Sequence, residues 1–358
     1  MKTGLRILFV YMIIFLSSMQ GSSRFQKQNY YSIKIDSLAI VAESQILWTG
    51  VAVSKTNRIF ANYPRWNKSV KGQVIEITKD GNKVDYPNSS WNDWEPGKPI
   101  DAKKFIAVQS VYTDDKDFLW VLDSGNPLLK GVQPGAAKLV KIDLSKNSVT
   151  AVYYFDSGSI ETASYLNDVR VDTKRNYAYI TDSGVGAIFV VDLAKSKIKK
   201  VLRNHFSTKA ENLTIVVDGI SLPGLEIHAD AIAYDNINDY LYYKALTGHK
   251  LYKIKGEYLR NFNLPLEEVD KKVEFVKEVG VCDGIEFHPN GCLFISSIED
   301  NSIKVLKPDG LLTVVLKNKL IRWPDSFSIT TDGKVYFTVS QLHDQNSNIP
   351  YRILKLDY

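Results

Sequence analysis

Residues 282–306, CDGIEFHPNGCLFISSIEDNSIKVL, contain in one stretch the pattern that decides the fold. An acidic residue, Asp283, precedes a strand of alternating character, and the turn HPNG separates this strand from a second, apolar one. A short polar break then leads into a third strand, SIKVL. Alternation with a period of two indicates β-strands, and Asn-Gly is a strong turn signal. The stretch is therefore predicted to form three successive strands joined by turns.

The same pattern occurs six times along the chain. The predicted first strands lie within residues 50–54, 109–115, 167–176, 229–239, 282–291 and 324–333. The second strands are 58–63, 118–124, 177–183, 240–246, 292–298 and 334–340, and the third are 72–77, 138–144, 187–193, 250–254, 302–306 and 351–356. Repeats of about forty to sixty residues with several strands each indicate a β-propeller. We therefore predict an all-β fold, a six-bladed β-propeller.

The ring is expected to close through the N-terminal part of the chain. Residues 31–41 (YSIKIDSLAIV) are strand-like and precede the first repeat, whereas the sixth repeat shows only three strands. We expect this segment to be the outer strand of the last blade, which would remove an open sheet edge. Trimming the chain past Val41 should then destabilise the whole ring. Because stacked blades form one cooperative unit, residues 23–358 are predicted to be a single domain.

The first 22 residues are predicted to be a secretory signal peptide. Lys2 and Arg6 precede the apolar run 7–16 (ILFVYMIIFL), and small residues follow at 17–23. This order of charge, apolar core and small residues is typical of a cleaved signal. An uncleaved anchor is the alternative. No second apolar run of spanning length occurs, so we expect a secreted protein, extracellular or periplasmic, with no membrane span.

The charge of the chain does not indicate a nucleic-acid-binding protein. The net charge of +5 is spread along 358 residues, and 44% of them are hydrophobic, as in an ordinary globular protein. The one basic cluster, 195–203 (KSKIKKVLR), alternates with apolar residues and follows a third strand. It is interpreted as a solvated sheet edge because no second basic cluster accompanies it.

The two cysteines, Cys282 and Cys292, are predicted to be buried and unpaired. The turn at 288–291 should place Cys292 opposite Phe287 and Cys282 near Ser297. In that register the two Cα atoms are too far apart for a disulfide.

The starts of the six first strands should converge at one mouth of the central channel, although they lie far apart in sequence. The predicted ligand-binding residues there are Trp48, Gln109, Asn167, Asp168, His228, Asp230, Asp283 and Asp325. No lysine accompanies the carboxylates in this set, and like charges that converge repel one another. A bound divalent cation would relieve this repulsion: oxygen donors suit Ca²⁺ or Mg²⁺, and a nearby His also admits Zn²⁺.

The opposing interpretation of these residues is structural. An Asp at the start of a strand often caps a turn or accepts backbone N–H groups of the next blade. The repeated Asp-Ser-Gly at 123–125 and 182–184 is expected to form such turns. Two further segments, 86–106 and 205–227, exceed the minimal blade and could cover the site or pack as surface loops. The motifs of α/β-type serine hydrolases, His-Glu-x-x-His zinc enzymes and phosphate loops do not occur.

The first repeat, 50–66, with its stretch RIFANYPRW (58–66), resembles the yellow and major royal jelly protein family, as does WVLDSG (120–125). The resemblance covers about Trp48 to Tyr358. It implies a secreted six-bladed propeller, and some members of the family bind small amines in the central channel. The usual cysteine set of the insect members is missing, which suggests a bacterial-type member.

A more distant similarity links the chain to gluconolactonase and senescence-marker-protein propellers. These hold a divalent metal with a Glu of the first blade, an Asn and an Asp. Asn167 and Asp283 match the Asn and the Asp. The Glu has no match, because the first blade begins with Trp48-Thr-Gly and Glu43 lies too early.

Three hypotheses about function follow. The first is a binding protein that holds a small polar or cationic ligand in the channel. The second is a metal-dependent lactone hydrolase in which Asn167 and Asp283, together with Asp230, hold the ion and Asp230 or Asp325 is the candidate general base. The third is an extracellular scaffold whose protein partner the sequence does not identify. The missing Glu favours the first.

Overall fold

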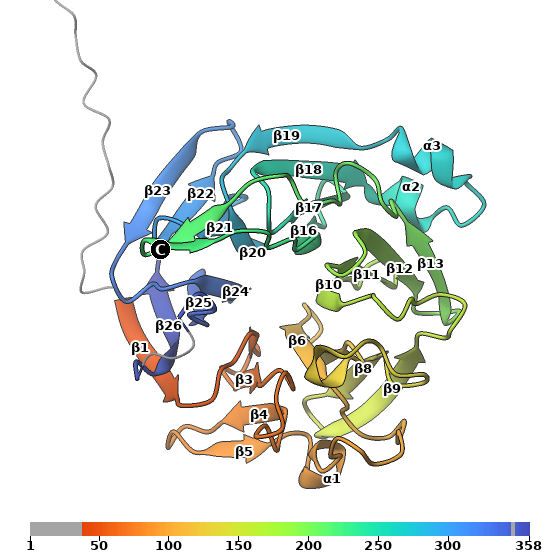
Figure 1. Ribbon diagram of the computed structural model, residues 1–358, viewed down its shortest axis with the longest axis vertical. Coiled ribbons are helices and arrows are strands. Elements are labelled where there is room, and N and C mark those ends of the chain that lie inside the picture. The colour runs from red at the N-terminus through yellow and green to blue at the C-terminus, as the bar shows by residue number, and fades with distance from the viewer. Residues whose placement is uncertain (1–37, 345–347) are drawn as a thin grey trace, which may run out of the picture. The chain divides into compact units, whose positions relative to one another are not determined.

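The computed structural model describes residues 38–344 and 348–358. The chain divides after Tyr31 into two units, and these residues belong to the second, 32–358. The segment 1–22, predicted to be a signal peptide, lies outside the described residues. Six four-stranded antiparallel sheets of the second unit are arranged as blades in a ring (Figure 1), which confirms the predicted six-bladed β-propeller.

Within blades 1 to 5 the strands follow one another outward from the centre of the ring, and blade 6 takes its outer strand from the start of the described chain. The innermost strands are β2 (Val51–Val53), β6 (Val108–Thr113), β10 (Leu166–Asp172), β16 (Ala229–Asp235), β20 (Cys282–Phe287) and β24 (Pro324–Ile329). The second strands are β3 (Ile59–Asn62), β7 (Phe118–Asp123), β11 (Tyr177–Asp182), β17 (Tyr240–Ala245), β21 (Leu293–Ser297) and β25 (Lys334–Val339). The third strands are β4 (Val74–Ile77), β8 (Lys138–Asp143), β12 (Ala187–Asp192), β18 (Lys250–Lys255), β22 (Ser302–Leu306) and β26 (Tyr351–Asp357). The outermost strands are β5 (Lys83–Asp85), β9 (Ser148–Tyr154), β13 (Lys197–Val201), β19 (Glu274–Glu278), β23 (Leu312–Lys317) and β1 (Leu38–Ser44).

The ring closes in blade 6 as predicted. Strand β1 pairs antiparallel with β26, from Leu38 opposite Leu356 to Ser44 opposite Tyr351. The order of the sheet is β1-β26-β25-β24, so the start of the described chain covers an edge of its last strand. The first part of the predicted strand, residues 31–37, lies outside the described residues.

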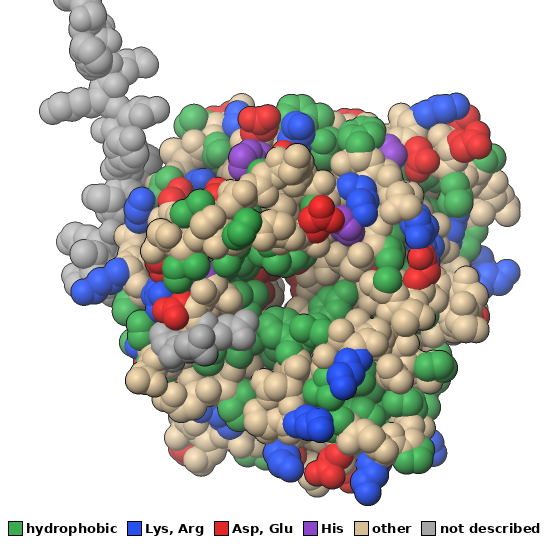
Figure 2. Space-filling model, in the orientation of Figure 1, with side chains coloured by type: hydrophobic (Ala, Val, Ile, Leu, Met, Phe, Trp, Pro, Cys, Tyr) green, Lys and Arg blue, Asp and Glu red, His purple; other side chains and the backbone are tan. Residues whose placement is uncertain are grey.

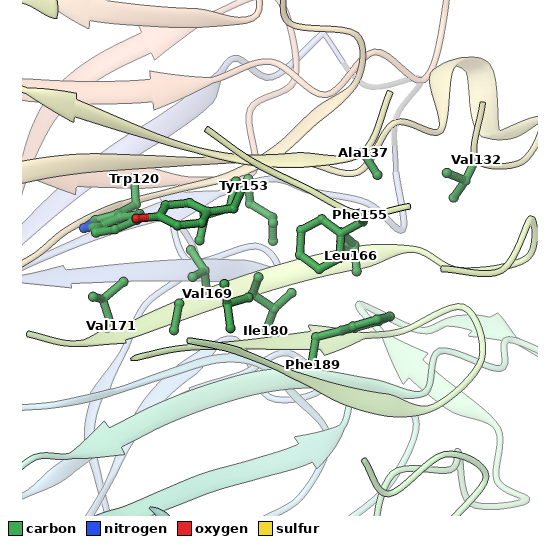
Figure 3. Packing of buried hydrophobic residues seen from close by; sticks show 14 residues of the cluster. Trp120, Val132, Ala137, Tyr153, Phe155, Leu166, Val169, Val171, Ile180 and Phe189 are labelled. Atoms are coloured by element: carbon green, nitrogen blue, oxygen red, sulfur yellow. The ribbon is translucent and has the colours of Figure 1, made fainter. Parts of the chain in front are cut away.

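The hydrophobic core lies between neighbouring blades. Between blades 2 and 3, Trp120 stacks on Tyr153 with ring centroids 6.2 Å apart, and Phe155 meets Phe189 edge to face at 5.3 Å (Figure 3). Complete burial of such a side chain contributes about 1.5–3 kcal/mol. Since both blades supply residues to one cluster, neither blade can bury its inner face alone.

Outside the blades, the described chain contains a few short elements. They are α1 (Ser89–Asn92), the 3₁₀ turn η2 (Pro127–Leu129), the hairpin β14 (Ile215–Val217) with β15 (Ile220–Leu222), and the helices α2 (Gly256–Arg260) and α3 (Leu266–Asp270). The hairpin belongs to the long segment 205–227. The repeat pattern did not predict α2 and α3, which connect β18 to β19. In the part of the chain that the structure describes, no helix has the length and apolar character needed to cross a membrane.

Both cysteines are buried and free, as predicted. Cys282 lies opposite Ser297. Leu293, rather than Cys292, lies opposite Phe287, and the backbone N–H of His288 donates to the carbonyl of Cys292 at 2.8 Å. The predicted position of Cys292 was therefore wrong by one residue, because His288 extends the pairing into the turn.

Candidate functional site

Five of the six innermost strands carry a β-bulge close to their first residue. The register shifts between Val108 and Ser110 in β6, and at equivalent points in β10, β16, β20 and β24. The second residue of each of these strands lies in the bulge and is polar: Gln109, Asn167, Asp230, Asp283 and Asp325. A bulge redirects a side chain at the end of a ladder. We call the channel end defined by these five residues the acidic mouth. In Figure 2 a narrow opening lies at the centre of the ring, with acidic side chains at its edge.

Threonine residues of two second strands fix bulges and link their blades to the next one in the ring. The Thr181 hydroxyl accepts the N–H of Asp168 at 3.1 Å and donates to the carbonyl of Asp230 at 2.7 Å. Thr338 likewise accepts the N–H of Ser326 at 3.1 Å and donates to the carbonyl of Thr49 at 2.6 Å. Hydroxyl groups thus make the backbone contacts that the structural interpretation assigned to the carboxylates.

A Cβ atom at Gly284 would lie 2.1 Å from the Asp325 carbonyl, so the glycine allows blades 5 and 6 to approach closely.

A chain of hydrogen bonds crosses the acidic mouth from blade to blade. The Trp66 indole donates to the Tyr165 hydroxyl at 2.5 Å, and this hydroxyl donates to Gln109 Oε1 at 2.6 Å. Gln109 Nε2 then donates to Asn167 Oδ1 at 3.0 Å, and Asn167 Nδ2 donates to Asp230. Four polar side chains from three blades and their connecting loops are thereby held in one geometry.

The series of hydrogen bonds continues through a pair of carboxyl groups. Asp230 and Asp283 are hydrogen-bonded to each other, and the Trp323 indole donates to Asp283 Oδ2 at 2.6 Å. Two carboxyl groups can share a hydrogen bond only if one of them is protonated. The tryptophan favours the ionised form of Asp283, so we place the proton on Asp230.

Burial and mutual repulsion raise the pKa values of the three carboxyl groups. Burial is the larger cause for each, and the charge of Asp168 adds to it. The pKa of Asp283 rises to about 7, and those of Asp230 and Asp325 lie well above the ordinary value for aspartate. Asp325 is held by Ser326 at 3.0 Å and by Ser340. These carboxyl groups therefore hold protons at a higher pH than exposed carboxylates do, because burial and the nearby charge of Asp168 disfavour their ionised forms.

One lysine lies near these carboxyl groups, which the sequence analysis did not expect. Lys244 is fully buried on β17, and its charge lowers the pKa of Asp283. Its ammonium donates to the carbonyl of Ala245 at 2.6 Å, and it makes no ion pair with any residue in the described ranges. Lys244 lies within the apolar run YLYYKAL, so its place in the sequence does not indicate a site residue.

Trp48 is not at the mouth but in the core. Its side chain is fully buried in the cluster between blades 1 and 6, stacked on Tyr63 at 6.1 Å. The indole N–H donates to the carbonyl of Arg352 at 3.2 Å. The ring has no surface left for a ligand, so we assign it a packing role.

His228 is turned towards the segment that follows β13. Its Nδ1 accepts from the N–H of Ala210 at 3.0 Å, and its Nε2 lies 2.6 Å from the ammonium of Lys209. Burial lowers the pKa of His228, and Lys209 lowers it further. Its hydrogen bonds do not reach the carboxyl groups of the mouth. Asp168 is buried next to Asn167 and acts on those carboxyl groups through its charge.

The hairpin β14–β15 packs on Trp323, the residue that donates to Asp283. Its apolar side packs in a cluster with Trp323 and with Ile298 of blade 5, and in Figure 1 it lies over that blade (green). Asp218 at the turn accepts from Arg322 Nε at 2.9 Å, from Asn301, and from His343 Nε2 at 3.0 Å. Burial alone would raise the pKa of Asp218, but these donors lower it. The segment 205–227 thus holds the residue that orients Asp283.

The metal hypothesis requires a third ligand that the site lacks. Among residues 38–344 and 348–358, no three His, Cys, Asp or Glu side chains are arranged to hold an ion. Both amide atoms of Asn167 are occupied, by Gln109 and Asp230. The start of the first blade offers Thr49, whose hydroxyl donates to the carbonyl of Gln109 at 2.8 Å, instead of a glutamate. As they stand, these residues do not fit a divalent cation, and we derive no catalytic step through one.

Further along β10 and β20, away from the acidic mouth, an arginine and a glutamate form an ion pair. Arg170 of β10 reaches across to Glu286 of β20, with Nε 2.7 Å from Oε2, and its guanidinium lies over the ring of Tyr112 at 5.2 Å. Arg170 also donates to the carbonyl of Ile285 at 3.0 Å. Both residues are visible in the sequences of these strands, but they belong to different repeats, and neither repeat alone indicates that the two side chains meet.

Comparison with known structures agrees with the fold. A gluconolactonase from Xanthomonas campestris aligns over 89% of both chains with a TM-score of 0.57 and 11% identity. The calcium-binding protein regucalcin from Agrobacterium tumefaciens aligns over 88% of this chain and 93% of its own, with a TM-score of 0.55 and 12% identity. At such identities the similarity extends to the fold alone.

Comparison of sequences is more specific. Major royal jelly protein 3 of Apis mellifera is 22% identical over 249 residues, which are 66% of this chain and 44% of the bee protein. The chain thus spans less than half of the length of that curated relative. Residues 106–352 match the family described as Major royal jelly protein. Since this match covers more than half of the chain, the protein belongs to the major royal jelly protein family.

Proposed function

We propose that the acidic mouth binds a small ligand that carries an ammonium group. The observation that supports this most is the set of three buried carboxyl groups, Asp230, Asp283 and Asp325, which have raised pKa values and no ion-pair partner among the described residues. A cationic ligand would supply the missing positive charge. The half-buried ring of Tyr165, next to Trp66, offers an aromatic wall on which a cation or an aromatic body can pack.

Binding of a cation should displace protons. At neutral pH the carboxyl pair shares a proton, and an ammonium group favours its ionised form. We therefore expect affinity to rise as pH rises through about 7, where Asp283 titrates, and proton release to accompany binding. This coupling separates binding at the mouth from non-specific attraction to exposed carboxylates, which titrate near pH 4.

The test is titration calorimetry of the purified protein with 1-naphthylmethylamine and, as a neutral control of the same shape, 1-naphthalenemethanol. We expect saturable binding of the amine, and a loss of about tenfold or more in Asp283→Asn, since a charge-assisted contact contributes about 1.5–3 kcal/mol. The matched control is Asp309→Asn, which replaces an exposed carboxylate in a turn of blade 5. Equal affinity for the amine and the alcohol would contradict the proposal.

A divalent-cation-dependent lactonase is the second candidate. It is favoured by the meeting of oxygen donors from Asn167, Asp230 and Asp283, but the start of the first blade offers Thr49 in place of a glutamate. Metal analysis of the purified protein, with Asp283→Asn beside it, decides between the candidates. One tightly bound ion per chain, lost in the variant, would favour the lactonase and a screen of lactones.

We further propose that the protein is secreted. The support is the N-terminal sequence, in which Lys2 and Arg6 precede the apolar run 7–16. Mass spectrometry of the protein exported by its host should find a mature N-terminus near residue 23. An intact residue 1 would indicate an uncleaved anchor.

A further inference from the structure

We propose that a second ligand site lies at the other end of the channel, in a groove between blades 4 and 5, and that it binds small aromatic carboxylates. This site is independent of the ammonium site proposed above, and neither requires the other.

The groove is part of a cavity of about 890 Å³. Its lining comes from the ends of innermost strands and the turns that follow them in blades 1, 2, 4, 5 and 6, and from the outer strands of blades 4 and 5. None of the five residues of the acidic mouth lines it. Ligand pockets typically have volumes of about 300–1,000 Å³, so the space suits a small organic molecule.

Arg170 and Glu286 mark the boundary between this cavity and the acidic mouth. Glu286 and Tyr112 line the cavity, and the guanidinium of Arg170 contacts both. Because Arg170 neutralises Glu286, the inner end of the cavity does not present a free negative charge to a ligand.

The walls of the groove are aromatic and apolar. Tyr242 of blade 4 and Phe287 of blade 5 meet edge to face, with centroids 5.1 Å apart, and both are only half-buried. Val276 and Leu306 continue the apolar surface on either side. A flat aromatic ring can pack against such a pair with favourable geometry.

The charged groups of the groove are lysines. Lys253 is paired with Glu274 at 3.5 Å and lies over the ring of Tyr240. Lys277 and Lys307, one from each wall, are half-buried, and their ammonium groups have no hydrogen-bond or ion-pair partner within residues 38–344 and 348–358.

The acidic residues in the turns after the innermost strands are engaged by donors of the chain itself. Asp115 accepts from Thr173, Asp332 pairs with Lys334 at 2.6 Å, and Asp114 and Asp235 hold the backbone. Asp114 accepts from two backbone N–H groups and from Trp120 Nε1, and Asp235 accepts from the N–H groups of Ile237 and Asn238. The local complement of the groove is therefore an anion with an aromatic body.

The test is titration of the full protein with 1-naphthoate, followed by intrinsic fluorescence and calorimetry. We expect saturable binding at one site, weaker by about tenfold or more in the double variant Lys277→Gln/Lys307→Gln. The control is Lys130→Gln/Lys319→Gln, which removes two exposed lysines that do not line the cavity. A thermal melt of each variant checks that the ring is folded.

Two comparisons make the result decisive. The neutral 1-naphthalenemethanol should bind the wild type and the double variant equally, and Asp283→Asn should leave the affinity for naphthoate unchanged. No saturable binding of naphthoate, or equal affinity in the wild type and the lysine variant, would overturn the proposal. A loss of naphthoate binding in Asp283→Asn would show that the two sites are one. Failure of the amine to bind the acidic mouth would leave this inference intact.

Discussion

The acidic mouth and the layer beneath it, which holds Arg170 and Glu286, are built from the same strands but differ in how their buried charges are compensated. At the bulges, Asp230 and Asp283 share a hydrogen bond and lack an ion pair among the described residues, and their pKa values rise. A few residues further along β10 and β20, Arg170 and Glu286 form an ion pair that is almost completely buried. Burial also raises the pKa of Glu286, but Arg170 opposes the rise.

The difference indicates which layer holds the ring together and which is available for a ligand. Burial of a charge without a partner costs several kcal/mol, so a folded protein keeps such groups only where something else stabilises them. In the Arg170–Glu286 pair, each buried charge is neutralised by the other. At the acidic mouth a proton reduces the negative charge of the carboxyl groups, and a cation from outside could replace that proton.

The largest effect on stability is expected from breaking the Arg170–Glu286 ion pair, which we call the inner pair. Arg170→Met leaves Glu286 buried without its partner, and we expect the free energy of unfolding to fall by about 3–5 kcal/mol at pH 7. Urea unfolding followed by tryptophan fluorescence measures it. The loss should be smaller at pH 5, where a Glu286 with a raised pKa can take up a proton.

The double variant Arg170→Met/Glu286→Gln is the matched control for this prediction. It removes both charges, so we expect it to recover most of the stability. If the double variant is as unstable as Arg170→Met alone, the arginine acts through its packing on Tyr112 and not through the ion pair.

A smaller effect of opposite sign is expected from Asp283→Asn at the acidic mouth. A carboxyl group whose folded pKa is raised to about 7 binds more protons in the folded state than in the unfolded state between about pH 4 and 7. Stability from this group is therefore present at low pH and is lost as pH rises through 7. Relative to the wild type, Asp283→Asn should gain about 1–3 kcal/mol between pH 5 and pH 8.

Paired urea titrations of the two proteins at pH 5 and pH 8 give this difference directly. A difference that does not change with pH would mean that Asp283 is ionised throughout, and the contrast with the inner pair would then disappear.

The contrast between the two layers shows which features of the fold and of the site could be predicted from the sequence. Strand periodicity and the turn residues predicted the blades, because each repeat obeys local rules that one segment such as 282–306 already displays. The starts of the innermost strands were also visible, since Asn167, Asp230 and Asp283 occupy equivalent places in the repeat. Their convergence follows from the ring and needs no further information.

Other features depended on contacts between blades, which no single repeat shows. Trp48 occupied the expected place at a strand start, but blade 6 packs against it and removes it from the channel. Lys244 was hidden in an apolar strand, and the pairing of Arg170 with Glu286 joins blades 3 and 5 across 116 positions of sequence. The hairpin that covers Trp323 comes from a segment without a repeat pattern.

A more local effect is expected from releasing that hairpin. Asp218→Ala removes the acceptor of Arg322, His343 and Asn301, so the hairpin should open while the ring stays folded. We expect a loss of about 1–2 kcal/mol in local stability, measured as faster hydrogen exchange in residues 213–225. Exchange in β20 and β24 should not change. Uniform acceleration over the whole ring would show that the hairpin is part of the core rather than a separate element packed on Trp323.

The smallest effect on stability, and the sharpest separation of stability from function, is expected from Tyr165→Phe. The hydroxyl of Tyr165 joins Trp66 to Gln109, and its loss leaves the ring in place. Because Tyr165 is half-buried, water can take over these bonds, so the free energy of unfolding should fall by no more than about 1 kcal/mol. The hydrogen-bonded chain that orients Asn167 and Asp230 would nevertheless be interrupted, and the affinity for 1-naphthylmethylamine should fall by about three- to tenfold. Calorimetry with the amine, beside a urea titration of the same variant, separates the two quantities. If stability falls and the affinity for the amine stays constant, the hydrogen bonds across the acidic mouth stabilise the fold, as the Arg170–Glu286 pair beneath them does, and do not orient a ligand site.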